Sequence, residues 1–266
     1  MTHWILWTLF ALVAALVGVA LFFFVVTQGA LKVRASRSGP GERAAHVYPV
    51  YSNPILIRIV DFQPVISAIL LGQYGALVSI ITERIRRMDL TGQTVLITSC
   101  AFGDVIPRVV RAATAAGARR VQMTDIVAEE LAHARRKLQD ATIELEYLDE
   151  DATAMTMADE RVAVNVMFFL LHEIPSWQQD RVLGEAARVL APGGVLFVAD
   201  FHRPEAGALR ALSWLYFKVF EPFGLALWDL GDPVRLLQSL SALQCERVTR
   251  TLGNFQVVVA TKPRAP

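Results

Sequence analysis

Apolar positions along the chain fall into two regimes. Residues 5–26 form an almost unbroken apolar run of 22 residues, and no charged residue lies between Trp4 and Leu31. As a helix with ~1.5 Å rise per residue, this run would cross the ~30 Å hydrocarbon core of a bilayer. We therefore predict a transmembrane anchor over residues 1–31. The alternatives are a cleaved signal peptide and a buried core helix, but the run is long and no Lys or Arg precedes it.

Positive charge follows this run directly. The basic residues just after it are Lys32, Arg34, Arg37 and Arg43. Basic residues beside a transmembrane helix favour the cytoplasmic side of the membrane. The expected arrangement is a single-pass protein of the cell inner membrane, with its soluble part in the cytoplasm. Residues 32–46, with Ser, Gly and Pro at 36–41, are expected to be a linker.

In the second regime, apolar positions recur in short segments. Residues 54–85 have a helix-like pattern inside an expected helical extension, residues 47–90. Beyond Asp89, runs typical of strands alternate with segments typical of helices. The expected strands are 94–99, 121–124, 143–148, 162–169 and 195–200, and a hairpin of 245–251 with 255–261 follows. Expected helices begin near Pro107, at Ile126 and at Ser176, where Ser176 and Gln179 have capping-box spacing.

This alternation predicts a mostly parallel sheet covered by helices on both faces. With the hairpin as an antiparallel edge, residues 91–266 are expected to form a Rossmann-like α/β domain of seven strands. In such sheets ligands bind beyond the carboxyl ends of the strands, where strand order reverses. Only residues at those ends are therefore candidates for a site.

Composition narrows the range of partners. The chain is 54% hydrophobic with a net charge of +1, so bulk electrostatics give no reason to expect a nucleic-acid partner. Cys100 and Cys245 lie far apart in the sequence and have no metal-ligand spacing. Neither a zinc site nor a disulfide framework is therefore expected.

The first predicted strand runs into a turn that contains Ser99, Cys100, Gly103 and Asp104. Small residues here let backbone N–H groups approach a nucleotide-like ligand. Asp125 ends the second strand, 21 positions after Asp104, where an acidic residue would bind ribose hydroxyls. The other interpretation of Asp125 is a plain helix N-cap.

Asp151 follows the third predicted strand inside the acidic cluster of residues 149–151. Its position suits a cofactor contact and a solvated loop equally well.

The order of these features resembles class I S-adenosylmethionine (SAM) methyltransferases. The resemblance is carried by the Gly-Asp turn, the acidic end of the second strand, Asp151-Ala152, and Leu-Ala-Pro-Gly-Gly-Val-Leu at 190–196, the expected turn into the fifth strand. In that superfamily the first loop usually reads Asp-x-Gly-x-Gly-x-Gly, whereas Ile97, Ser99 and Ala101 here replace the acid and two glycines. The resemblance implies SAM as the cofactor, bound by Ser99, Cys100, Gly103, Asp104, Asp125 and Asp151.

A narrower resemblance, over residues 51–262, is to the RquA family of rhodoquinone biosynthesis. Its more specific strings are Phe-Phe-Leu-Leu-His-Glu at 168–173 and Asp-x-His-Arg-Pro at 200–204, with weaker agreement such as Glu-Pro-Phe at 221–223. This resemblance implies a SAM-using membrane enzyme that replaces a methoxy group of ubiquinone by an amino group. It also implies a divalent metal such as manganese, whose ligands the spacing of acidic residues does not identify. The apolar run at the amino terminus is not part of the resemblance.

Three residues are candidates for the catalytic step. His172 and Glu173 follow the fourth predicted strand, and His202 follows the fifth. Displacement of methoxide by an amine needs a base, and histidine accepts protons near neutral pH. The plain alternatives are a backbone hydrogen bond for His172 and a helix cap for Glu173.

Residues 209–228 carry six aromatic side chains and few charges. They are typical of a core helix packed on the sheet, or of an interfacial lid that admits a polyprenyl quinone from the bilayer.

Two further functions stay open on the sequence. One is a conventional SAM-dependent methyltransferase acting on a quinone precursor or another lipid. The other is a non-catalytic scaffold that binds SAM.

Overall fold

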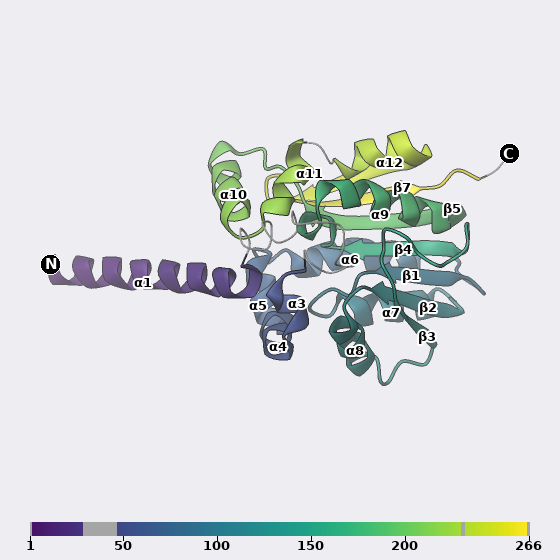
Figure 1. Ribbon diagram of the computed structural model, residues 1–266, viewed down its shortest axis with the longest axis horizontal. Coiled ribbons are helices and arrows are strands. Elements are labelled where there is room, and N and C mark those ends of the chain that lie inside the picture. Colours follow the sequence, from purple (N-terminus) through teal and green to yellow (C-terminus); the bar gives the residue numbers. More distant parts are fainter. Residues whose placement is uncertain (1, 29–46, 230–231, 265–266) are drawn as a thin grey trace.

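A computed structural model describes residues 2–28, 47–229 and 232–264. The expected linker, residues 32–46, and the four basic residues within it lie outside the described residues. Helix α1 (Thr2–Thr27) projects away from the rest of the chain (Figure 1). It is long and apolar enough to cross a membrane, and only 6% of its most apolar stretch is buried. An apolar helix near an amino terminus is also typical of signal sequences.

The seven strands form one mixed sheet in the order β3-β2-β1-β4-β5-β7-β6. The first five pair in parallel, whereas β7 is antiparallel to both β5 and β6. The predicted α/β class, with its carboxyl-terminal hairpin, is confirmed. The strands are β1 (Thr94–Thr98), β2 (Arg120–Asp125), β3 (Glu144–Asp149), β4 (Val162–Phe168), β5 (Leu190–Phe201), β6 (Gln244–Arg250) and β7 (Phe255–Thr261).

Helices cover both faces of this sheet, which is why the central strands β1 and β4 are buried along almost their whole length. On one face the core contains side chains of α6 (Tyr74–Arg86), α7 (Val105–Ala115) and α8 (Ala128–Lys137). On the other it contains side chains of α9 (Ser176–Val189) and α12 (Pro233–Ser241). Helix α12 was not predicted from the sequence, although Asp232-Pro233 is a helix-start signal. The Asp232 carboxylate caps this helix by accepting a hydrogen bond from Val234 N at 3.0 Å.

The apolar stretch 54–85 is broken into separate helices rather than one. These are α4 (Pro54–Asp61), α5 (Gln63–Ile69) and α6, preceded by the short α3 (Pro49–Ser52). Asn53 starts α4 by accepting a hydrogen bond from Ile55 N at 2.9 Å. Leu71 and Gly72 have positive φ angles of 51° and 73° and so end the second segment.

Two local expectations were wrong. Ser176 is inside α9 and makes no capping hydrogen bond, because Pro175 occupies the cap position; Gln179 instead donates to Leu171 O at 2.8 Å. Residues 191–194 were expected to be a turn, but they belong to the long β5. The reason is pairing: Gly193 N donates to Lys262 O at 2.9 Å, and Lys262 N donates to Gly194 O at 3.0 Å.

The aromatic stretch 209–228 folds into three pieces and does not form one helix. They are α10 (Gly207–Val219), the 3-10 turn η2 (Pro222–Leu225) and α11 (Ala226–Asp229). Another 3-10 turn, η1 (Leu171–Glu173), lies between β4 and α9. The helix α10 and the pair α4–α5 flank the point where α1 leaves the domain (Figure 1).

The close packing of Gly103 against the Tyr74 side chain can be tested by substitution. The φ of Gly103 is +77°, and a Cβ there would lie 2.5 Å from the hydroxyl oxygen of the buried Tyr74. We expect Gly103→Ala to lower the free energy of unfolding by ~2–4 kcal/mol, from backbone strain and overpacking together. Thermal unfolding in detergent measures this effect. The matched control is Gly75→Ala, whose Cβ meets no atom within 4 Å, so its stability should be unchanged or slightly higher. Equal melting temperatures for both variants would contradict the assigned role of Gly103.

Candidate active site

The parallel strands β1, β2, β3, β4 and β5 end at one edge, and strand order reverses between β1 and β4. The loop after β1, residues 99–104, crosses this edge with Ser99 and Ala101 at two positions where the usual motif has glycine. Ser99 adopts a left-handed φ of +70°, a conformation that costs a non-glycine residue ~1–3 kcal/mol unless its surroundings hold it. Tyr74 provides part of that support: its hydroxyl donates to Phe102 O at 3.0 Å and accepts from Val105 N at 2.7 Å.

Asp125 holds the same loop from the end of β2. One carboxylate oxygen accepts from Cys100 N at 2.7 Å and from the Ser99 hydroxyl at 3.2 Å. The other accepts from Val127 N at 2.9 Å, yet Asp125 is not a helix N-cap, because α8 starts after Val127. Burial raises the pKa of Asp125 to about 6, although these hydrogen bonds favour its charged form.

A crevice lies beside Asp125, and we call it the strand-end crevice. Its lining includes Ser99, Asp125, Glu150, Asp151 and Gln178. Asp151 faces it from the turn after β3, where its carboxylate also accepts a hydrogen bond from Thr153 N at 2.8 Å. The structure therefore brings together three of the residues expected to bind a cofactor, Ser99, Asp125 and Asp151.

The other residues expected to bind a cofactor are placed differently. Cys100 contributes its amide to Asp125, while burial raises the pKa of its thiol. Gly103 is tied back to the helical extension, since its N–H donates to Asp61 at 2.8 Å. Asp104 is half-exposed, lies 3.9 Å from Arg108 and does not line the strand-end crevice. Among described residues, Asp104 is thus the weakest of the predicted cofactor contacts.

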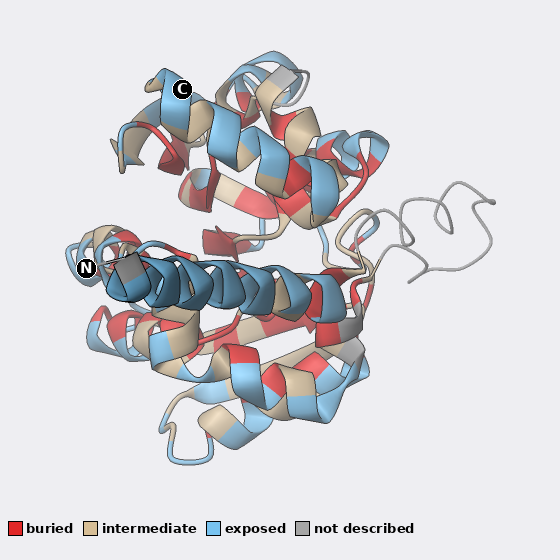
Figure 2. Cartoon of the chain, turned by 90° about the vertical axis from the view of Figure 1, so that its left-hand side faces the viewer, coloured by how far each residue is buried: buried red, intermediate tan, exposed pale blue. Residues whose placement is uncertain are grey.

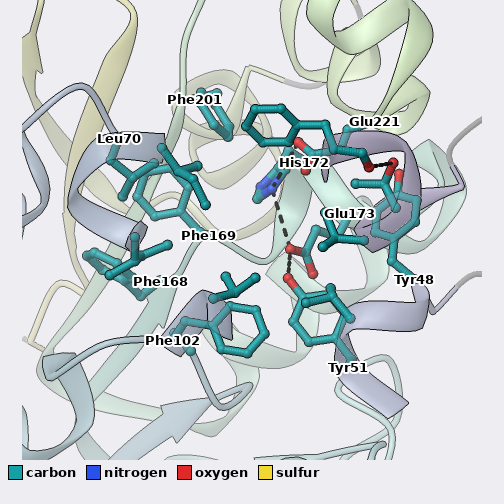
Figure 3. Close-up of a pocket in the computed structure, with 18 of the residues that line it drawn as sticks. Tyr48, Tyr51, Leu70, Phe102, Phe168, Phe169, His172, Glu173, Phe201 and Glu221 are labelled. Carbon is teal, nitrogen blue, oxygen red and sulfur yellow. Dashed lines mark hydrogen bonds and ion pairs between the residues drawn. The ribbon is translucent and has the colours of Figure 1, made fainter. Parts of the chain in front are cut away.

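A second, larger pocket of about 780 Å³, counted with its open mouth, lies between the strand ends and the helical extension (Figure 3). We call it the aromatic pocket. A smaller hollow lined by Tyr51, Ser99, Asp125 and Glu173 shares residues with both spaces. The two larger spaces therefore adjoin. Lining residues of the aromatic pocket include Phe23, Val26, Tyr48, Tyr51, Ser99, Cys100, Phe102, Phe168, Phe169, His172, Glu173, Phe201, Tyr216 and Glu221.

His172 stands among three carboxylates in this pocket. Its Nδ1 lies 2.9 Å from Asp200, and its Nε2 lies 3.5 Å from Glu173 and 3.7 Å from Glu221. The Asp200 side chain has no exposed surface and is fixed by backbone N–H groups of Leu171, at 2.9 Å, and Phe201. An imidazole in this position has a carboxylate beside each ring nitrogen.

Burial by itself lowers the pKa of His172. The negative charges of Asp200, Glu173 and Glu221 outweigh burial and raise this pKa to about 9. Burial also raises the pKa of Glu173, to about 8, although the positive charge of His172 opposes the rise. Near neutral pH the ring thus carries a proton on both nitrogens, while Glu173 titrates close to physiological pH.

Glu173 also contacts Tyr51, which donates its hydroxyl hydrogen bond to the carboxylate (Figure 3). The Tyr51 ring stacks on Phe102, with centroids 5.1 Å apart and an interplanar angle of 7°. Phe102 belongs to the loop after β1. One stacked pair therefore links the acid–base cluster to the loop that borders the strand-end crevice.

His202 is not part of this cluster. Its Nδ1 lies 2.7 Å from Gly253 O, in the hairpin loop, and its Nε2 lies 3.2 Å from Arg247. It does not line the aromatic pocket. His202 directly follows β5, as the sequence predicts, but its backbone N–H donates to Asn254 O at 2.9 Å, in the hairpin loop.

Sequence reasoning missed Glu221 and Asp61 as individual site residues. Glu221 follows α10 and reaches His172, and the Glu221-Pro222-Phe223 string was the available signal. Asp61, at the end of α4, accepts from Gly103 N, binds Lys137, and lies 3.0 Å from His133. It fastens the helical extension to the loop after β1.

The described residues do not fit the metal that the RquA resemblance implies. Among them, no group of three or more His, Cys, Asp or Glu side chains is arranged to hold a metal ion.

Known sequences place this chain near quinone-modifying enzymes. Residues 95–194 match the family model described as a methyltransferase domain. The chain is 32% identical over 124 residues to a demethylmenaquinone methyltransferase of Thermus thermophilus, covering 46% of this chain and 56% of that protein. It is 30% identical over 149 residues to the ubiquinone/menaquinone biosynthesis C-methyltransferase UbiE of Klebsiella pneumoniae, covering 55% and 58%. The chain thus spans little more than half the length of these curated relatives.

Solved structures share the fold at low identity. The CurJ carbon methyltransferase superposes with a TM-score of 0.60 and 16% identity, covering 91% of this chain and 66% of that one. A SAM-dependent methyltransferase from Aquifex aeolicus gives a TM-score of 0.54 and 18% identity, covering 79% and 98%. The fold is therefore that of class I SAM methyltransferases.

The raised pKa of the buried Glu130, close to Asp125, can be tested by substitution. Glu130 is 2% exposed, and burial with the nearby Asp125 raises its pKa from the usual 4.5 to about 9. The folded chain thus keeps a proton that the unfolded chain releases, so this stability contribution is complete below pH 4.5 and is lost as pH rises toward 9. Glu130→Gln removes that dependence, and we expect it to raise the free energy of unfolding at pH 8 by ~1–3 kcal/mol.

The exposed neighbour Glu129 supplies the control. Glu129→Gln should leave the pH dependence of the melting temperature unchanged. A Glu130→Gln variant with the same melting temperature as the parent between pH 5 and pH 8 would show that Glu130 is ionised in the folded chain.

Proposed function

We propose that this protein is a SAM-dependent transferase that modifies the ring of a quinone at the membrane. One observation carries the proposal: a large aromatic pocket with a buried acid–base cluster adjoins the strand-end crevice, where this fold binds its cofactor. Two substrates that share such a boundary can react across it. The relatives in the comparison, whose names concern quinone biosynthesis, support the same substrate class.

SAM fits the strand-end crevice by the chemistry of its lining. One Asp125 carboxylate oxygen already accepts from Cys100 N and the Ser99 hydroxyl, whereas the oxygen that accepts from Val127 N has a further lone pair, which suits a ribose hydroxyl. Asp151 and Ser99 border the same space. The loop after β1 needs no phosphate-binding geometry, since SAM has no phosphate, and this accommodates the replaced glycines.

A quinone ring fits the aromatic pocket. Phe102, Phe169 and Phe201 offer flat apolar surfaces for an aromatic ring. The protonated His172 offers a charged hydrogen-bond donor to a ring oxygen, which gains negative charge when the ring is attacked or deprotonated. The tail of a polyprenyl quinone would leave through the open side of the pocket.

The reaction that we propose first is replacement of a ring methoxy group by an amino group. SAM supplies the nitrogen: a C–N bond to the ring forms as the C–O bond to the methoxy group breaks, and methanol leaves with the proton that the nitrogen loses. The bond between this nitrogen and Cα of SAM then breaks as a proton passes from Cβ to the nitrogen, which leaves an amino group on the ring and an unsaturated carboxylate on the remainder of SAM. Glu173 is assigned as the base that takes the proton lost by the nitrogen in the first step, because its raised pKa lies near neutral pH. His172, the first candidate base on the sequence, is assigned to stabilise charge on the ring oxygen.

Ring methylation is the second candidate, and the names of the relatives favour it. There a C–C bond forms to the methyl group of SAM as its C–S bond breaks, and the ring carbon loses a proton. Glu173 and His172 would serve the same ends, as base and as partner of the ring oxygen. The machinery on the protein side is common to both reactions.

Quinone extracts from cells with and without the gene separate these functions. Mass spectrometry should show an amino-substituted quinone that depends on the gene. A methylated quinone with accumulation of its precursor in the deletion strain would establish methylation instead. Identical quinone profiles, together with SAM binding by the purified protein, would leave a non-catalytic scaffold and refute the proposed activity.

Asp125 and Asp104 make a matched pair for the cofactor site. Asp125→Ala should weaken SAM binding by ~1.5–3 kcal/mol, the cost of losing hydrogen bonds to a charged acceptor. Asp104→Ala should leave affinity unchanged, because this half-exposed carboxylate lies outside the crevice. Isothermal titration calorimetry measures both. Equal affinities would move the ribose contact away from β2.

Glu173→Gln tests the base. We expect turnover to fall ~10²–10⁴-fold with SAM affinity nearly unchanged, since Gln keeps the shape but accepts no proton. The parent enzyme should gain activity as pH rises from 6 toward 8, because the raised pKa of Glu173, about 8, keeps it protonated at lower pH. Steady-state rates from pH 6 to 9 measure this limb. A fully active Gln variant would show that Glu173 is not the base.

A further inference from the structure

The outer wall of the aromatic pocket consists of helices with two apolar faces. Their inner faces line the pocket with Phe23 and Val26 of α1, Val60 of α4, Ile66 of α5 and Tyr216 of α10. These helices also carry large apolar side chains that point away from the pocket and into solvent. A wall helix of a soluble enzyme needs only one apolar face, so the outer face requires an explanation.

Eight of these exposed residues lie on the two elements that flank the base of α1 (Figure 1), and we call them the apolar collar. Their exposed fractions run from 42% to 69%. Four belong to α10 and four to the segment from α4 to the turn that follows α5. They are Leu212, Trp214, Leu215 and Val219 on one side, and Ile55, Ile59, Phe62 and Leu71 on the other.

The collar is continuous with α1. The ring of Phe23, near the end of α1, lies 5.0 Å from Tyr216 and 5.6 Å from Phe220, so α10 packs directly on the anchor helix. From this contact toward its amino terminus, α1 is exposed along almost its whole length (Figure 2). If α1 is inserted in a bilayer, both halves of the collar lie at the depth where the helix emerges (Figure 1).

Charge on the same helices favours an anionic surface. Within α4, α5 and α10 two charged side chains are exposed, Arg58 and Lys218, and both are basic. The acid within these helices, Asp61, points inward to Lys137 and His133. Basic groups on long stems beside exposed Leu and Trp are typical of helices that lie in the headgroup layer of a membrane.

We propose that the apolar collar lies in the interfacial layer of a bilayer that contains anionic lipids, so that the aromatic pocket opens toward lipid. A water-insoluble ligand would then pass between α1 and its neighbours without crossing water. The lipid contact is independent of the reaction; only the identification of the ligand as a quinone rests on the proposed function.

The test uses the full chain in vesicles of phosphatidylcholine and phosphatidylglycerol. A polarity-sensitive fluorophore is attached to Leu215→Cys on α10 and, separately, to Ile59→Cys on α4. The control is Ala158→Cys, an exposed site just before β4 at the opposite end of the sheet. The unsubstituted chain measures labelling of the buried Cys100 and the half-buried Cys245.

At both collar sites we expect blue-shifted emission and several-fold stronger quenching by lipids that carry a nitroxide near the headgroup than at Ala158. Quenching at the collar no stronger than at Ala158 would overturn the proposal. So would blue-shifted emission without lipid quenching, which would indicate that a second copy of the chain covers the collar. No substrate is present in this experiment, so its outcome is distinguishable from that of the quinone profile.

Discussion

An imidazole buried among carboxylates is the constraint on which the rest of the site depends. His172 keeps its positive charge away from water only because Asp200 compensates it at 2.9 Å, with Glu173 and Glu221 beyond. Asp200 in turn is held by backbone N–H groups at the end of β5. The carboxyl-terminal edge of the sheet therefore holds the positive charge of His172 in place. The segments that cover this edge supply Glu221 and exclude solvent.

The loop after β1 keeps a defined shape although Ser99 and Ala101 replace two glycines that are usual in this fold. The loop after β1 carries one left-handed serine, and its shape is held from outside by Tyr74, Asp125 and Asp61. Two of these supports come from the helical extension that precedes the sheet. That extension therefore supports the loop after β1 and is not an appendage to the sheet.

Local patterns were enough to predict most strands and the sheet class, because strand periodicity and turn residues act over a few positions. They placed His172, Asp125 and Asp151 at strand ends for the same reason. The contact between Tyr51 and Glu173 joins residues 122 positions apart, and Glu221 reaches His172 from beyond α10. Such pairs depend on how helices pack over the edge. For His172 the sequence gives residue type and position, but its protonation state follows from neighbours that only the fold assembles.

Packing also changes the meaning of the amino-terminal helix. A simple anchor would need only length and apolarity, yet Phe23 and Val26 of α1 line the pocket beside Tyr51 and Glu173. The helix that is long enough to cross a bilayer is therefore also a wall of the site. One side of α1 contacts the pocket while the rest of the helix stays exposed. Without α1 the pocket would lose Phe23 and Val26 from its wall, so the shape of the site depends on this helix.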